Sequence, residues 1–126
     1  MSNKINLNLG NNVLSFNFGA FDLDYQTNDT KDAKLQAKSR ELVDKANAFK
    51  DKEAEMNDQE YRQVIKPLID EFFSTMFDDD APQKIYEAAG ENTWTYLDVF
   101  LQISNNIQKE WNKKLNDENF KKYLAE

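Results

Sequence analysis

The sequence predicts a mainly α-helical domain that begins with a short β-hairpin, an α+β fold in which long helices run antiparallel. Two periodicities carry this prediction. Apolar residues alternate with polar ones over residues 5–25, as in β-strands, and recur every three or four positions after residue 29, as on amphipathic helices. A chain of 126 residues can bury about two thirds of its unfolded surface. We therefore expect a single domain, 1–126, with an extended start (1–27) and a helical body (29–126).

The extended start is expected to form the hairpin. The Gly-Asn-Asn sequence at 10–12 suits the positive φ angles of tight turns, so segments 5–9 and 14–18 are predicted to pair around it. Residues 21–25 then form a third strand or an extended exit. An isolated hairpin is marginally stable in water, so its apolar side chains must pack on the helices or on a neighbouring subunit. The alternating residues are Ile5, Leu7, Leu9, Leu14, Phe16, Phe18, Phe21, Leu23 and Tyr25.

The first helix is predicted to begin at Asp29 or Thr30, either of which can cap it, and to end near Met56. Its apolar positions form one narrow stripe, and the remaining positions are mostly charged or polar. Such a stripe is typical of a helical hairpin or a coiled-coil-like contact. The stripe consists of Leu35, Leu42, Ala46, Phe49 and Met56.

A second helix is predicted to begin after Asn57, which resembles a capping box together with Glu60. Its apolar residues continue as far as the aspartates at 78–80. Pro67 lies inside this run, where it removes a backbone hydrogen-bond donor. The proline is therefore predicted to kink the helix or to split it near Lys66.

Two further helices follow the aspartates. Asp80 is predicted to cap a short helix that has Pro82 in its first turn and ends at Gly90. Asn92 or Thr93 is predicted to cap the last long helix. Its apolar positions are Trp94, Leu97, Phe100, Leu101, Ile103, Ile107, Trp111 and Leu115, and Phe120, Tyr123 and Leu124 continue it or form a short final helix.

The two most apolar helices carry more apolar surface than one buried face requires. The apolar positions of residues 61–77 spread over roughly 220° of a helical wheel, and those of residues 94–115 spread about as widely. A helix with one face on a core needs an arc of only about 100°. Either both helices are covered on two sides by their own chain, or part of each arc is covered by another chain.

Composition argues against several functions. The chain has no His and no Cys and lacks a glycine-rich phosphate loop, so we expect no enzyme activity and no cofactor. The net charge is −7, and residues 70–98 alone carry −7, with eight acidic residues and one lysine. The basic residues are dispersed, so no nucleic-acid partner is expected. The three consecutive aspartates lack the alternate spacing of a calcium loop, so we predict helix capping there and no metal site.

The N-terminal sequence MSNKINLNLG lacks the continuous apolar core of a signal peptide. No stretch of the chain approaches the ~20 apolar residues that span a bilayer. Secretion and membrane insertion are therefore not expected. The lack of cysteine is compatible with a reducing cytoplasm.

Two stretches, LSFNFGAFDL and IDEFFSTMFDDDAPQKIYEAAGENTWTYLDVFLQI, together with the charged helix between them, resemble the tail assembly chaperones of long-tailed (siphovirus-type) phages of Gram-positive hosts. The shared pattern is a phenylalanine-rich helix end, an acidic turn, a KIY helix and an aromatic last helix. The resemblance implies a homo-oligomer that binds the tape measure protein in the host cytoplasm. It also implies that the protein keeps this client soluble during tail morphogenesis and is absent from the mature virion.

If the resemblance holds, part of the wide apolar arcs serves as a binding surface for the client or for a second copy. The candidate protein-binding residues are Phe72, Phe73, Met76, Phe77, Trp94, Leu97 and Trp111. Two alternative functions remain open. One is an acidic phage inhibitor that mimics nucleic acid to block a host nuclease, and the other is a structural head-tail connector or tail terminator.

Overall fold

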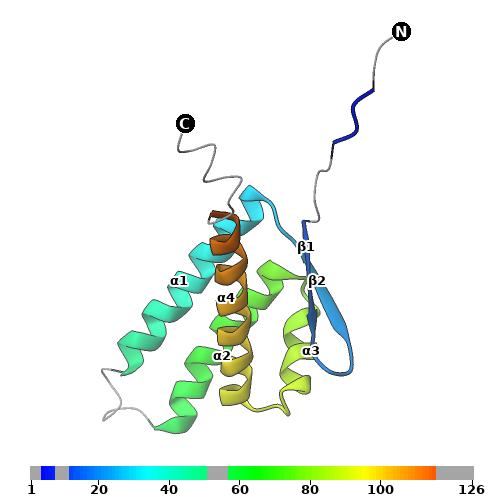
Figure 1. Ribbon diagram of the computed structural model, residues 1–126. Coiled ribbons are helices and arrows are strands. Elements are labelled where there is room, and N and C mark those ends of the chain that lie inside the picture. Colours follow the sequence, from blue (N-terminus) through cyan, green and yellow to red (C-terminus); the bar gives the residue numbers. More distant parts are fainter. Residues whose placement is uncertain (1–3, 8–11, 51–56, 116–126) are drawn as a thin grey trace.

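The computed structural model describes residues 4–7, 12–50 and 57–115, without the side chains of residues 49, 50, 111, 114 and 115. This part of the chain forms a two-stranded antiparallel hairpin followed by four helices (Figure 1). The predicted fold class, mainly α with a short N-terminal β-hairpin, is confirmed.

The hairpin lies further along the chain than predicted. Its strands are β1, Val13–Asn17, and β2, Asp22–Gln26, with Phe16 opposite Leu23. Residues 4–7 are not in a strand, so the predicted pairing around 10–12 is wrong for these residues, and residues 8–11 lie outside the described part.

The observed turn has a clear physical cause. Gly19 adopts a positive φ of 97°, which side-chain-bearing residues rarely adopt. The Asn17 carboxamide accepts a hydrogen bond from the Gly19 N–H at 2.7 Å. The Phe18 N–H donates to the Phe21 carbonyl at 2.9 Å. Glycine as the first central residue of a two-residue loop is a favoured way to close a hairpin.

The alternation along both strands separates a packed face from a wet face. The apolar face lies on the helices, and Tyr25 is fully buried there. Phe16 and Phe18 meet the ring of Phe77 edge-on, with centroids 6.2 and 6.3 Å away. The hairpin thus packs on its own helical body, which was one of the two predicted possibilities.

Helix α1 spans Asp29–Lys50. Its cap is Asn28, whose side-chain oxygen accepts from the Lys31 N–H at 2.8 Å, so the predicted caps Asp29 and Thr30 are wrong by one or two residues. The predicted end near Met56 lies outside the described residues. Of the predicted stripe, Leu35 and Leu42 are buried and Ala46 is partly buried.

Helix α2 spans Asp58–Met76. Asn57 caps it as predicted, accepting from the Glu60 N–H at 2.8 Å. Pro67 sits inside a single helix, so the chain is not split there. The helix lies at the centre of the fold and contacts α1, Ala81–Ala88 (α3) and Thr93–Leu115 (α4).

The acidic turn works through a different aspartate from the one predicted. Asp78 accepts hydrogen bonds from the Asp80 and Ala81 N–H groups at 3.0 and 2.8 Å. Asp80 makes no side-chain capping bond, so its predicted role passes to Asp78. The expected stop at Gly90 is confirmed, because this glycine has a φ of 73° just after α3.

Helix α4 is capped by Asn92, the first of the two predicted residues, which accepts from the Trp94 and Thr95 N–H groups at 3.0 and 3.2 Å. Predicted apolar positions beyond residue 115 lie outside the described part. The core that these elements enclose consists of Tyr25, Leu35, Leu42, Ile65, Ile69, Phe72, Phe73, Met76, Ala81, Ile85, Ala89, Tyr96, Phe100, Ile103 and Ile107.

Two tyrosines bring hydroxyl groups into partly buried hydrogen bonds between elements. Tyr25 donates to Asp32 at 2.5 Å and Tyr96 donates to Asp70 at 2.7 Å. Burial, strengthened by these carboxylate neighbours, raises the pKa of both phenols above the usual value. Each tyrosine is therefore neutral at neutral pH. Its hydroxyl group donates a hydrogen bond to a carboxylate of another element and so links the two elements.

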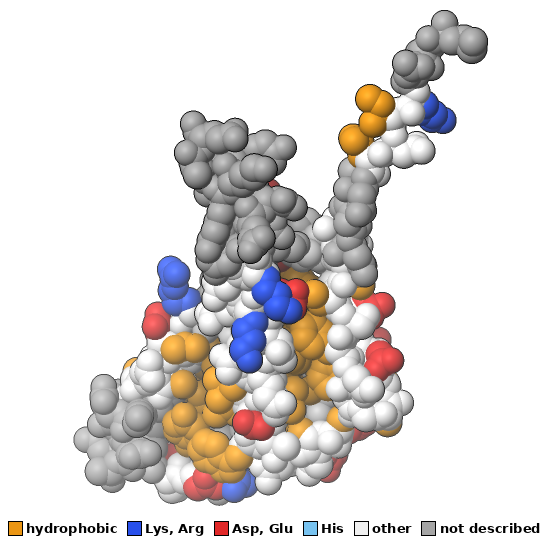
Figure 2. Space-filling model, in the orientation of Figure 1, with side chains coloured by type: hydrophobic (Ala, Val, Ile, Leu, Met, Phe, Trp, Pro, Cys, Tyr) orange, Lys and Arg blue, Asp and Glu red, His pale blue; other side chains and the backbone are white. Residues whose placement is uncertain are grey.

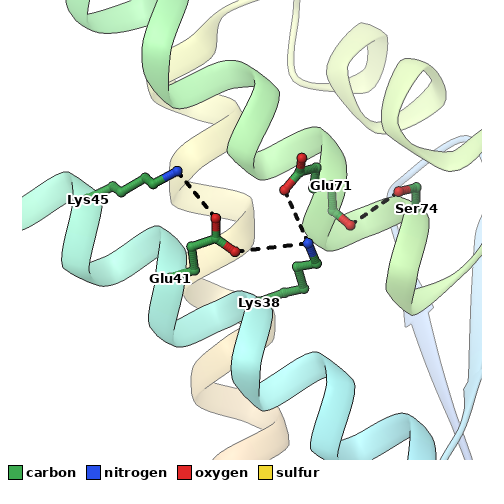
Figure 3. Close-up of polar contacts among 5 residues, drawn as sticks. All are labelled: Lys38, Glu41, Lys45, Glu71 and Ser74. Atoms are coloured by element: carbon green, nitrogen blue, oxygen red, sulfur yellow. Dashed lines mark hydrogen bonds and ion pairs between the residues drawn. The ribbon is translucent and has the colours of Figure 1, made fainter.

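Helices α1 and α2 are also linked by charged side chains at the surface (Figure 3). Lys38 lies 3.4 Å from Glu71 of α2 and 3.9 Å from Glu41 of its own helix, and Lys45 lies 3.3 Å from Glu41. These side chains are largely exposed, so the pairs contribute little to stability. They do place the charges of this part of α1 beside α2.

Candidate protein-binding surface

Three of the seven predicted binding residues belong to the core. Phe72, Phe73 and Met76 are at most 2% exposed. They are buried because α2 lies between α1, α3, α4 and the hairpin, so its wide apolar arc is covered by its own chain. The prediction that these three residues bind another chain is therefore wrong for this fold.

The other four predicted residues differ in exposure. Phe77 is partly buried beneath the hairpin rings, and Leu97 is partly buried against the core. Trp94 is 40% exposed. Trp111 lies in α4, but its side chain is outside the described part. Of the predicted set, Trp94 offers the clearest available surface.

Trp94 is held in place while part of it remains in contact with solvent. Its indole N–H donates to Asp58 at 3.0 Å, and its ring stacks on Tyr61 with centroids 5.0 Å apart. Asp58 in turn pairs with Arg62. A fixed aromatic ring loses little side-chain entropy when another surface packs on it, which favours contact residues of this type.

A groove of about 700 Å³ lies between α1 and α4, which we call the α1/α4 groove. Both helices pack on α2, and the floor between them contains apolar side chains from all three helices. The walls are mostly uncharged and polar. The lining residues are Leu35, Gln36, Ser39, Arg40, Val43, Phe72, Ser104, Ile107, Gln108 and Asn112.

Apolar surface continues from the groove lining to Leu101, which lies outside it. The lining residue Val43 is 41% exposed and Leu101 is 45% exposed. Leu101 precedes the lining residues Ser104 and Gln108 by three and seven positions, which puts the three on one face of α4. Figure 2 shows hydrophobic side chains at the surface on the side of α4 that faces α1. This surface is larger than a scattered exposed leucine would give.

Arg40 is the charged member of the lining. Within the described part of the chain it makes no ion pair, whereas Lys38 and Lys45 of the same helix pair with glutamates. The lining contains no carboxylate or imidazole. The arrangement can therefore bind an apolar surface that carries an acidic group, and it provides no acid–base pair.

In the acidic turn, Asp78 is used for capping. The described residues contain no group of three or more side chains arranged to hold a metal ion. No helix in this same part of the chain is long and apolar enough to cross a membrane.

Comparison with protein-family models, with curated proteins and with solved structures gives no match to this chain.

Three residues of this surface were not predicted from the sequence, although two of them left a signal. Val43 follows the buried Leu42 and so lies about 100° around the helix, away from the stripe used for packing. Leu101 was counted among the apolar positions of the last helix without being assigned to an exposed face. Arg40 left no such signal, because Asp44 lies four positions after it and the sequence would favour an ion pair between them.

Proposed function

We propose that this chain is a non-catalytic binding protein that receives an amphipathic helix of another protein in the α1/α4 groove. The observation that carries the proposal is the open apolar floor of this groove, flanked by the exposed side chains of Val43 and Leu101. Helix-in-groove recognition uses apolar ligand residues at positions i, i+3, i+4 and i+7. Helices α1 and α4 both pack on α2, and the groove between them offers such a ligand helix a place to pack.

The partner we propose is the tape measure protein of a long-tailed phage, following the resemblance of the sequence to tail assembly chaperones. A long helical client presents repeated amphipathic segments, each of which needs its apolar stripe covered before the tail tube forms around it. The groove lining suits such a stripe, and Arg40 suits an acidic residue beside it. The net charge of −7 favours solubility of the complex. The proposal places the complex in the host cytoplasm and excludes the chaperone from the mature virion.

Co-expression with the tape measure protein encoded just downstream tests this proposal. The test variants are Leu101→Asp and Val43→Asp, which place a carboxylate in the apolar part of the surface. The matched control is Asn106→Asp, which adds the same charge to an exposed position of the same helix. Asn106 lies five residues after Leu101, about 140° around α4.

We expect the wild type and Asn106→Asp to keep the tape measure protein soluble and to co-purify with it. Leu101→Asp should lose at least about tenfold in affinity, because binding would bury its carboxylate. Val43→Asp should also weaken binding, because it replaces an apolar contact by a charged group. Both positions are exposed, so thermal unfolding should confirm that the variants remain folded. Lack of any complex, or equal binding by Leu101→Asp and the wild type, would contradict the proposal.

Mass spectrometry of purified virions separates the proposal from the structural alternative. A tail assembly chaperone should be absent from virions or present only in trace amounts. A head-tail connector or tail terminator would be found at a fixed copy number.

A further inference from the structure

We propose that residues 4–7 form an arm that adds as a third strand to the hairpin of a second copy of this chain. The inference does not depend on the α1/α4 groove. It begins with Ile5 and Leu7, which are 80% and 76% exposed. Figure 1 shows this segment standing away from the hairpin and the helices. The alternation of Ile5, Asn6 and Leu7 places both apolar side chains on one side of an extended chain.

The hairpin presents an edge that can accept such a strand. Backbone hydrogen bonds link residue 12 with 27 and residue 18 with 21. Because paired residues in antiparallel strands alternate between bonded and non-bonded pairs, the N–H and C=O groups of Asp22, Asp24 and Gln26 point away from β1. These three residues are exposed, and they make no backbone hydrogen bond to another described segment. An exposed edge of this kind is a template for strand addition.

Charge selects the β2 edge for the arm. The outward side chains of β2 include Asp22 and Asp24, whereas those of β1 are uncharged. We place Ile5 and Leu7 of the arm on the packed face, beside Leu23. Lys4 and Asn6 then lie on the solvent-exposed face, where the two aspartates also lie. In the antiparallel register with Ile5 opposite Leu23, Lys4 lies opposite Asp24, and opposite charges in such a cross-strand pair are favourable.

Chain length selects a second copy as the source of the arm. An arm antiparallel to β2 is parallel to β1, and parallel strands need a crossover of a dozen or more residues. Only five residues separate Leu7 from Val13 in the sequence, too few for the arm to reach its own β2 in this direction. Two copies can instead exchange arms reciprocally, which gives a closed two-fold dimer.

Sedimentation velocity over a concentration series tests the proposal with the full-length chain. We expect the wild type to dimerise, and the double variant Ile5→Ser with Leu7→Ser to associate at least about tenfold more weakly. Both side chains are exposed in the single chain, so circular dichroism should show an unchanged fold. Gln83→Ser is the control, since it changes an exposed side chain of α3 that lies in neither proposed binding surface, and it should dimerise like the wild type.

Cysteine cross-linking tests the register, because the chain has no native cysteine. Asn6→Cys mixed with Asp22→Cys under mild oxidation should give a disulfide-linked dimer, because opposite residues in such a pair lie about 5.5 Å apart between Cα atoms. Asn6→Cys mixed with Gln83→Cys, an exposed position on α3, should give little product. A strictly monomeric wild type, an unchanged dimer in the double serine variant, or equal cross-linking to residues 22 and 83 would each overturn the proposal.

Discussion

Replacing Phe73 by alanine separates the core assignment of this residue from a role in partner binding. The side chain is fully buried, and its ring contacts the rings of Phe72 and Tyr96, with centroids 5.4 Å away in both cases. Truncating a buried phenylalanine typically costs about 3–5 kcal/mol, because transfer energy and packing contacts are both lost. A domain of this size has a free energy of unfolding on the order of 5–15 kcal/mol, so Phe73→Ala should remove a large share of it.

The assay is urea unfolding followed by circular dichroism, with Leu101→Ala as the matched control. Leu101 is 45% exposed, so its truncation should change the free energy of unfolding by no more than about 0.5 kcal/mol. The reasoning would be refuted if Phe73→Ala lost less than about 1 kcal/mol while partner binding fell. In that case Phe73 would belong to an interface rather than to the core.

Three further predictions concern the caps, the buried tyrosines and the groove charge. Asp78→Ala should lower the free energy of unfolding by about 1 kcal/mol, because the N–H groups that Asp78 caps lose their acceptor. In the same urea unfolding assay, Asp80→Ala should have a much smaller effect, because Asp80 makes no side-chain capping bond. Burial raises the pKa of Tyr96 in the folded state, whereas an unfolded tyrosine titrates near pH 10. Above about pH 10 the unfolded chain therefore holds fewer protons than the folded chain, so the free energy of unfolding should fall as the pH rises. Tyr96→Phe should show a shallower alkaline loss in thermal unfolding from pH 8 to about 11, and an equal loss in both proteins would contradict the assignment. Calorimetry should compare two peptides that differ only beside the apolar stripe, where one has an acidic residue and the other has glutamine. Arg40→Glu should weaken binding of the acidic peptide more than binding of the glutamine peptide. Equal effects on both would show that Arg40 does not face the peptide.

Much of the helical fold could be predicted from the sequence, because its signals are local. Asn57 and Asn92 cap the helices that were expected to follow them, and Gly90 ends the short one with a positive φ. Each of these residues acts on backbone groups within four positions. Pro67 shows the limit of such rules, because α2 continues through it as one helix that packs on three others, where local preference allowed a break.

The hairpin shows how two local signals can compete. The Gly-Asn-Asn at 10–12 and the Asn-Phe-Gly at 17–19 both favour a turn, and the alternation of apolar residues changes phase at each of them, between Leu9 and Leu14 and between Phe18 and Phe21. Phe16 and Phe18 decide between them by packing on Phe77, a contact with a residue some sixty positions away. A contact at that separation leaves no periodic trace in the sequence.

The sequence predicted that an apolar binding surface exists, but it did not predict which helices form it. The wide apolar arcs indicated an excess of apolar surface, but helix α2 uses its arc for the core and the open surface lies between α1 and α4. Which side of a helix is left open depends on how the helices are arranged around it. For this reason Phe73 was misplaced and Val43 and Leu101 were missed.

Hydrogen exchange measured on the complex with a soluble tape measure fragment tests the central claim most directly. A helix bound in the α1/α4 groove should slow amide exchange in the two segments that face it, residues 36–43 of α1 and 101–108 of α4. Helix α3 should exchange at the same rate as in the free protein. Protection confined to the hairpin or α3, or no protection at all from a fragment that co-purifies, would contradict the claim that this groove is the binding site.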